Sequence, residues 1–122
     1  MIKIYGYNKC DTCRKAIQFL EKQNIPFKNI PIVEQPPTIT ELKKMLGFIE
    51  KNGGTFKNLF NTSGVQYREL GISEKLKSGL TEKAALQLLS ENGKLIKRPF
   101  LLSDDFGFVG FKIDEWKSLK IK

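Results

Sequence analysis

The chain has no histidine among its 122 residues, and it has only two cysteines. Without an imidazole it can perform neither Ser–His nor Cys–His catalysis, and it lacks histidine metal ligands and histidine pH switches. Long hydrophobic runs are also missing, since none approaches the roughly 18 to 20 apolar residues that a membrane-spanning helix needs. The N-terminal segment turns polar after five residues, so we expect neither a signal peptide nor an anchor. One closely spaced cysteine pair in an unexported chain indicates redox or metal use, and we expect a cytoplasmic protein.

Positive charge is in excess, with 21 lysines and arginines against 13 acidic residues and a net charge of +8. The lysines are scattered along the chain, which is typical of solubility and of a general attraction for anions. No zinc-finger, RNP or Gly-X-X-Gly pattern accompanies them. We therefore expect a single-domain monomer that makes no direct contact with nucleic acid or membrane.

The spacing of apolar residues predicts strands at both ends of the chain and helices in the middle. Residues 2–5 alternate as in a strand, and a helix follows to about Gln23, with Asp11 and Thr12 as candidate N-caps. The other predicted elements are a strand at 25–33, helices at 39–51 and 81–91, short helical pieces within 56–79, strands at 94–103 and 108–111, and a helix at 114–119. The inward residues of the 81–91 helix are expected to be Ala84, Ala85, Leu88 and Leu89.

This order of elements predicts the fold. The chain opens as β-α-β and closes as β-β-α, which is the order of a thioredoxin-like domain. We therefore predict an α/β protein whose mixed four-stranded sheet has flanking helices. The thioredoxin-like core would comprise residues 1–35 and 94–122, and residues 36–93 would form an all-helical insertion.

Both cysteines lie in the stretch GYNKCDTCRK, where a predicted strand leads into a predicted helix. The first turn of a helix favours a thiolate, because its free N–H groups and the positive end of its dipole stabilise negative charge. Cys10 at this position would be a nucleophile, and Cys13 one turn later could attack an adduct on Cys10 and close a disulfide. Asn8 and Thr12 are expected to shape the loop around Cys10. Two alternatives remain open, namely inert thiols and a zinc site shared between subunits, although this chain alone offers no metal site.

Four separated segments carry a family resemblance. They are Y-x-x-x-x-C-x-x-C-R-K-A from Tyr5, LFNTSGVQYRELGI from Leu59, KRPFL from Lys97 and GFKIDEW from Gly110. In this order they resemble the arsenate reductase family of glutaredoxin-like proteins, which also contains the Spx-type transcriptional regulators. The resemblance covers essentially the whole chain.

The resemblance implies a thioredoxin fold with a helical insertion and no bound cofactor. In the reductases, the cysteine that matches Cys10 attacks arsenate, and glutathione with glutaredoxin then releases arsenite. Thioredoxin is another possible reductant. Arg98 matches an anion-binding arginine, and Pro99 is expected to follow a cis peptide bond, which is rare enough to mark a functional feature.

Three positions depart from the reductase pattern. Asn61 begins the segment in which the reductases have an arginine, and Lys112 stands in place of another, keeping the charge but losing the bidentate geometry of a guanidinium. Cys13 is the third departure, because the Spx-type regulators carry a Cys-X-X-Cys disulfide switch. In those regulators the oxidised form binds the C-terminal domain of the α subunit of RNA polymerase. Three hypotheses follow: an oxidoreductase in which Cys13 resolves the intermediate on Cys10, a redox-switch regulator, and a redox-inert binding domain.

Overall fold

The structure is a computed structural model that describes residues 2–7 and 9–117. Its strands are β1 (Ile2–Gly6), β2 (Phe27–Pro31), β3 (Phe100–Leu102) and β4 (Gly107–Val109). Its α-helices are α1 (Asp11–Lys22), α2 (Ile39–Lys51), α3 (Val65–Glu69), α4 (Ile72–Lys77), α5 (Glu82–Glu91) and α6 (Ile113–Trp116), and two 3-10 turns are η1 (Phe56–Leu59) and η2 (Gly93–Leu95).

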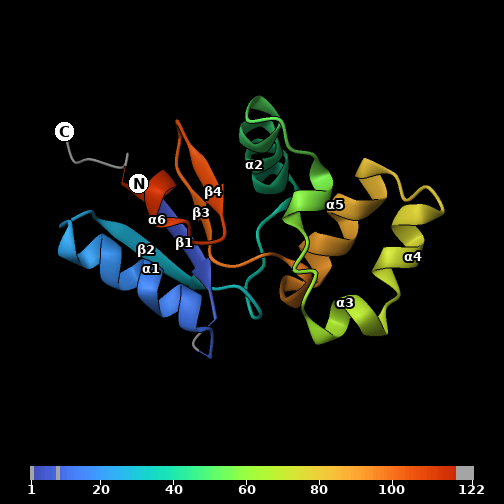
Figure 1. Ribbon diagram of the computed structural model, residues 1–122, viewed down its shortest axis with the longest axis horizontal. Coiled ribbons are helices and arrows are strands. Elements are labelled where there is room, and N and C mark those ends of the chain that lie inside the picture. The colour runs from blue at the N-terminus through green and yellow to red at the C-terminus, as the bar shows by residue number, and fades with distance from the viewer. Residues whose placement is uncertain (1, 8, 118–122) are drawn as a thin grey trace.

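The four strands form one mixed sheet in the order β2-β1-β3-β4. β1 runs parallel to β2, while β3 is antiparallel to both β1 and β4. Parallel pairing of β1 with β2 requires a crossover, and α1 provides it. The mixed four-stranded sheet with flanking helices confirms the predicted α/β, thioredoxin-like fold (Figure 1).

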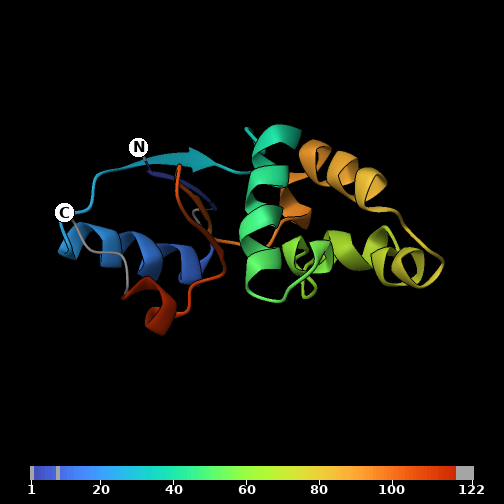
Figure 2. The ribbon, with the colours of Figure 1, turned by 90° about the horizontal axis from the view of Figure 1, so that it is seen from above.

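Two hydrophobic clusters hold the sheet between layers of helices. On one face, Ile4 and Leu101 of the sheet pack with Ala16 and Leu20 of α1 and with Trp116 of α6. On the other face, the cluster contains residues of β1, β2 and β3 together with buried residues of α2, α4 and α5. The helices from α2 to α5 gather in a second lobe beside the sheet (Figures 1 and 2).

Threonines begin the two long helices of this second lobe. Thr38 and Glu41 form a reciprocal capping box at the start of α2, and Thr81 caps α5 by accepting a hydrogen bond from the Ala84 N–H. The predicted helices at 39–51 and 81–91 are thereby confirmed. Their end signals also lie where expected, since Asn52 and Asn92 are the C-cap residues.

Several predicted details are wrong. The strand predicted at 94–103 is limited to β3, because Gly93–Leu95 form a 3-10 turn and Pro99 has no N–H to donate to a sheet. In α5 the buried stripe is Ala85, Leu86 and Leu89, so Ala84 is exposed rather than inward. The final helix ends at Trp116, and the Leu119 predicted to extend it lies outside the described residues.

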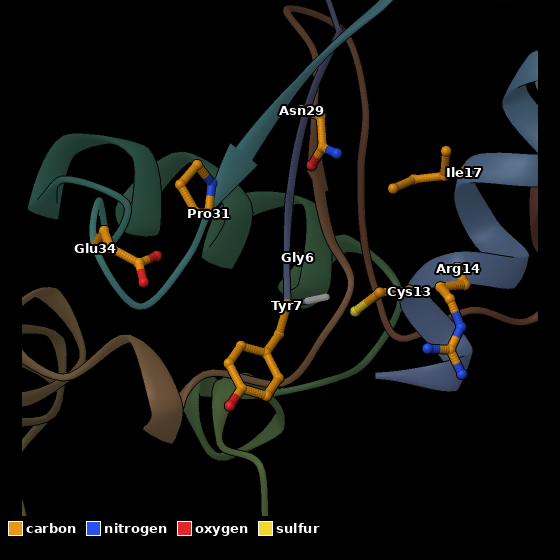
Figure 3. Close-up of a pocket in the computed structure, with 8 residues that line it drawn as sticks. All are labelled: Gly6, Tyr7, Cys13, Arg14, Ile17, Asn29, Pro31 and Glu34. Carbon is orange, nitrogen blue, oxygen red and sulfur yellow. The ribbon is translucent and has the colours of Figure 1, made fainter. Parts of the chain in front are cut away.

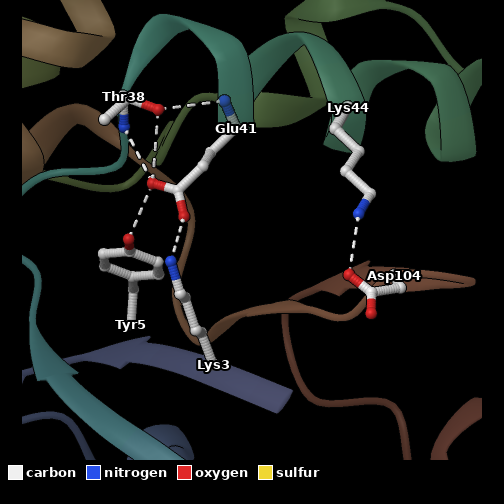
Figure 4. A network of polar contacts seen from close by, with 6 residues as sticks. All are labelled: Lys3, Tyr5, Thr38, Glu41, Lys44 and Asp104. Atoms are coloured by element: carbon white, nitrogen blue, oxygen red, sulfur yellow. Dashed lines mark hydrogen bonds and ion pairs between the residues drawn. The ribbon is translucent and has the colours of Figure 1, made fainter. Parts of the chain in front are cut away.

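A polar network joins the sheet to the second lobe (Figure 4). Glu41 of α2 accepts hydrogen bonds from the Tyr5 hydroxyl at 2.8 Å and from Lys3 Nζ at 3.0 Å. Burial acts to raise the pKa of Glu41, but hydrogen bonds from the Thr38 backbone, Tyr5 and Lys3 outweigh it and lower the pKa below its usual value. Lys44 and Asp104 form a second, exposed ion pair between α2 and the turn before β4.

Candidate active site

Cys10 is the N-cap residue of α1. Its backbone is extended, with φ −102° and ψ 112°, and its Sγ accepts a hydrogen bond from the Cys13 N–H at 3.3 Å. Asp11 and Thr12, predicted as caps, instead occupy the exposed first turn of the helix, so that prediction is wrong. Sulfur is larger than oxygen, so the Cys10 side chain can accept the backbone hydrogen bond that a serine or threonine N-cap usually accepts. Cys10 is half-buried as a residue, and its sulfur contacts the N-terminus of the helix.

Cys13 is almost fully buried, with 1% of its surface exposed. A Cβ placed on Gly6 would lie 3.5 Å from the Cys13 Sγ, an ordinary contact distance, so the sulfur packs closely against the end of β1. Burial is the largest cause that raises the pKa of Cys13 to about 12, and the hydrogen bond to Cys10 and the charge of Cys10 act in the same direction. The Tyr7 backbone and the Arg98 guanidinium act to lower it. Cys13 is thus a neutral thiol at neutral pH.

Arg98 lies against the loop that precedes the cysteines. Its guanidinium carbon is 5.2 Å from the centre of the Tyr7 ring, a cation–π distance. The Arg98–Pro99 bond is cis, as predicted, and the buried Pro99 accepts a hydrogen bond from the Gly110 N–H at 2.8 Å. The charge of Arg98 acts to lower the pKa of Cys13.

Asn61 of the second lobe lies beside the segment that carries Arg98. The Asn61 N–H donates to the Leu95 carbonyl at 2.7 Å, and the Lys97 N–H donates to the Leu59 carbonyl at 2.8 Å. This short antiparallel pairing brings Asn61 beside the segment that ends in Arg98. Together they enclose a cavity of about 320 Å³, the Arg98 pocket, which is lined by Tyr7, Asn61, Gly64, Val65, Gln66, Glu69, Lys94 and Arg98.

A second and larger cavity also has Tyr7 in its lining. This Cys13 pocket, of about 560 Å³, is lined by Gly6, Tyr7, Cys13, Arg14, Ile17, Asn29, Pro31 and Glu34. Figure 3 shows the Cys13 sulfur pointing from α1 toward Gly6, and the side chains of Ile17 and Asn29 on the two sides of the space between α1 and β2. Arg14 also forms an ion pair with Asp11. Tyr7 is common to the linings of both pockets.

The predicted site residues are only partly brought together. Five of them lie around the loop that contains Tyr7, namely Cys10, Cys13, Arg98, Pro99 and Asn61. Thr12 is instead exposed on α1. Lys112 is exposed and lines a smaller cavity of about 170 Å³ together with residues that include Lys97 and Glu115. Asn8, predicted to shape the loop, lies outside the described residues.

Sequence reasoning did not identify Tyr7, Gln66, Glu69 or Lys94 as candidate site residues. Tyr7 stands three residues before Cys10 and could have been found from that spacing. Glu69 and Lys94 have no such signal, because only the fold of the second lobe brings them to Arg98.

Within residues 2–7 and 9–117, no group of three or more histidine, cysteine, aspartate or glutamate side chains is arranged to hold a metal ion. None of the helices in that part of the chain is both long and apolar enough to cross a membrane.

The mixed sheet and the cysteine pair at the start of α1 define a thioredoxin-fold protein with a Cys-X-X-Cys site. The model of the ArsC family matches residues 5–119, and the chain belongs to this family. A solved structure described as an ArsC family related protein from Bacteroides fragilis is 43% identical, with a TM-score of 0.89 over 98% of this chain and 97% of that one.

Relatives of two functional kinds are similar to the chain. The crystal structure of a possible arsenate reductase from Streptococcus mutans is 34% identical, with a TM-score of 0.81 over 96% of this chain and 98% of that one. The global transcriptional regulator Spx of Enterococcus faecalis is 32% identical over 94% of this chain and 83% of its own length. Family membership therefore leaves both an enzyme and a regulator to be considered.

Proposed function

We propose that the protein is a cytoplasmic thiol–disulfide oxidoreductase in which Cys10 attacks the substrate and Cys13 resolves the intermediate. The observation that carries this proposal is the unequal environment of the two sulfurs. Cys10 is partly exposed and accepts a backbone N–H at the start of α1, whereas Cys13 is buried beside it. A substrate in solution therefore meets Cys10 first, and Cys13 is placed to attack an adduct formed on Cys10.

The reaction proceeds in two balanced exchanges. The Cys10 thiolate attacks one sulfur of a disulfide, forms a mixed disulfide and expels the other half as a thiolate, which takes a proton from water. Once Cys10 is in the mixed disulfide, its negative charge is gone and one of the causes that raise the pKa of Cys13 is lost. The Cys13 thiolate then attacks the Cys10 sulfur, closes the internal disulfide and expels the second thiol. The substrate gains two electrons, and a thioredoxin or glutaredoxin system, or glutathione, returns them to the protein.

A disulfide is a better candidate substrate than arsenate. An oxyanion site needs converging cations, and in the Arg98 pocket Arg98 and Lys94 are accompanied by the carboxylate of Glu69. Asn61 contributes no charge, and Lys112 lines a separate cavity. In this proposal Arg98 stabilises negative charge on the sulfurs, Pro99 and Asn61 support the loop beside them, and Thr12 and Lys112 have at most a peripheral role.

Redox titration and turnover on cysteine variants test the proposal. Wild-type protein should form a Cys10–Cys13 disulfide in defined thiol buffers and reduce a small disulfide when thioredoxin or glutaredoxin is supplied. Cys10→Ser should abolish turnover, and Cys13→Ser should accumulate a mixed disulfide on Cys10 that mass spectrometry detects. Gln18→Ala, on the exposed side of α1, is the control. If no internal disulfide forms in any buffer and no disulfide is reduced, the proposal is wrong.

The second candidate is a redox-switch regulator that binds the C-terminal domain of the α subunit of RNA polymerase. The 32% identity to Spx over 94% of the chain, together with the closely placed cysteines, favours it. It predicts no turnover, and an affinity for that domain that rises when the Cys10–Cys13 disulfide closes. Titration of the polymerase domain with oxidised protein and with the Cys13→Ser variant distinguishes the two functions.

A further inference from the structure

The Arg98 pocket contains charges of both signs. Arg98 and Lys94 are the cations of its lining and Glu69 is its carboxylate; Arg98 is half-buried, and Lys94 and Glu69 are exposed to solvent. Among the described residues none of the three forms an ion pair, and Arg98 instead contacts the Tyr7 ring. A cavity with unpaired positive and negative groups is complementary to a ligand that carries both an anion and a cation.

Gln66 adds a polar group to the same wall. Its Oε1 is buried and has no hydrogen-bond partner among the described residues. Buried amide oxygens are usually paired, so an unpaired one lining a cavity marks a place where a polar ligand group would be stabilising.

The position and the size of the pocket connect it to the cysteines. Tyr7 lines the pocket, and its carbonyl accepts a hydrogen bond from the Cys10 N–H at 3.0 Å. A ligand held there lies beside the loop that carries the nucleophile. The volume of about 320 Å³ is at the small end of the roughly 300 to 1,000 Å³ typical of small-molecule sites, which favours a small molecule over a protein segment.

We propose that the Arg98 pocket selects the disulfides of free amino-acid-type thiols, binding the substrate carboxylate through Arg98 and Lys94 and its ammonium group through Glu69. This inference rests on the proposed function and names its substrate class. Glu69 is then a specificity-determining residue for the reaction at Cys10, and it discriminates against simple oxyanions because its carboxylate repels them.

Single-turnover oxidation of the reduced protein tests this proposal without an external reductant. Four small disulfides carry different charged groups: cystine has carboxylate and ammonium groups, dithiodiglycolate only carboxylates, cystamine only ammonium groups, and bis(2-hydroxyethyl) disulfide neither. Each rate of Cys10–Cys13 disulfide formation is divided by the rate of a free model thiol with the same compound, which removes the intrinsic reactivity. We expect the normalised rate for cystine to exceed that for the hydroxyethyl compound by about tenfold or more.

Charge-removing variants assign the selection to the pocket. Glu69→Gln should lower the normalised rate for cystamine, relative to that for the hydroxyethyl compound, by about three- to tenfold, and it should affect the relative rate for dithiodiglycolate less. Lys94→Gln should lower the relative rate for dithiodiglycolate and affect that for cystamine less. Glu74→Gln and Lys75→Gln, which remove exposed charges from α4 outside the pocket, are the matched controls and should change neither ratio.

The outcomes are distinguishable. Equal normalised rates for all four disulfides, or equal effects of the pocket and control variants, would overturn the selection of amino-acid-type disulfides while leaving the oxidoreductase intact. So would a preference for cystine with blocked amino and carboxyl groups, which stands for a cysteine inside a protein chain. Failure of every disulfide to oxidise the reduced protein would instead reject the proposed function.

Discussion

Replacing Cys10 should lower the pKa of Cys13, and this change tests the order of events at the two sulfurs. The pKa of Cys13 is about 12 against an ordinary value of 9.0, which reduces its thiolate fraction at neutral pH by about a thousandfold. Burial is the largest cause, and it persists in every variant that keeps the fold. The hydrogen bond to Cys10 and the charge of Cys10 are the causes that a substitution removes.

In Cys10→Ala both contributions of Cys10 are lost, while the Tyr7 backbone and Arg98 still act to lower the pKa. We expect a pKa of Cys13 between its ordinary value and that of the wild type, and each unit of decrease gives a tenfold larger thiolate fraction. Cys10→Ser keeps a hydrogen-bonding group without the thiolate charge and should give an intermediate pKa. The two variants together separate the hydrogen bond from the charge.

The assay is the pH dependence of alkylation of Cys13 by iodoacetamide, with the modified cysteine located by fragmentation mass spectrometry. Circular dichroism at each pH confirms that the protein remains folded. An unchanged or higher pKa of Cys13 in Cys10→Ala would refute this prediction, because it would mean that Cys10 does not raise the pKa of the resolving thiol. An ordinary pKa in the wild type would refute the role of burial.

Three further predictions concern the framework of the site. Glu41→Gln should lower the free energy of unfolding at pH 7 by about 1–2 kcal/mol, because it weakens the hydrogen bonds from Tyr5 and Lys3. Glu50→Gln, which changes an exposed residue of α2, is the control. Since the folded-state pKa of Glu41 is lowered, the difference should be present above the unfolded pKa and should vanish as the pH falls through the folded pKa, which urea titrations at several pH values measure. Gly93→Ala should destabilise the protein by about 2–3 kcal/mol, because its Cβ would overlap the Ile32 carbonyl. Gly47→Ala, at an exposed position in the middle of α2, should instead stabilise it by about 0.5–1 kcal/mol. Thermal unfolding that ranks the two variants the other way would contradict this. Gly6→Val should slow closure of the Cys10–Cys13 disulfide in a thiol-buffer time course by displacing the Cys13 sulfur, while Gly6→Ala, whose Cβ would make ordinary contacts, should not.

The predictable parts of the fold are those that depend on neighbours in the sequence. Thr38 with Glu41 and Thr81 mark helix starts through local hydrogen bonds, and both helices begin where these residues predict. The strand predicted at 94–103 was wrong in its first half, because buried hydrophobic residues occur both in β3 and in the irregular segment before it. Leu95 and Ile96 are buried without belonging to a sheet strand, since Ile96 forms an isolated bridge with Phe60 of the second lobe. Burial alone does not distinguish a strand from a packed irregular segment.

The candidate site divides in the same way. Cys10 and Cys13 are three residues apart on one helix, so their proximity was predictable from the sequence. Arg98 required the family resemblance, because nothing local connects it with Cys10. Glu69 was not predictable by either route, since its place in the lining of the Arg98 pocket depends on how α3 packs against η2.

This division separates the chemistry of the site from its selectivity. The sulfurs, Tyr7 and Arg98 belong to the sheet and its connections, and they set the reactivity of the thiols through burial and charge. Gln66 and Glu69 belong to the second lobe, and they reach the Arg98 pocket without touching the causes that set the pKa of Cys13. A change in the second lobe can therefore alter which molecule is held beside Cys10 while leaving the two exchanges unchanged. If Glu69→Gln shifted the pKa of Cys13 as well as the preference for charged disulfides, selection and reactivity would be coupled, and this separation would be wrong.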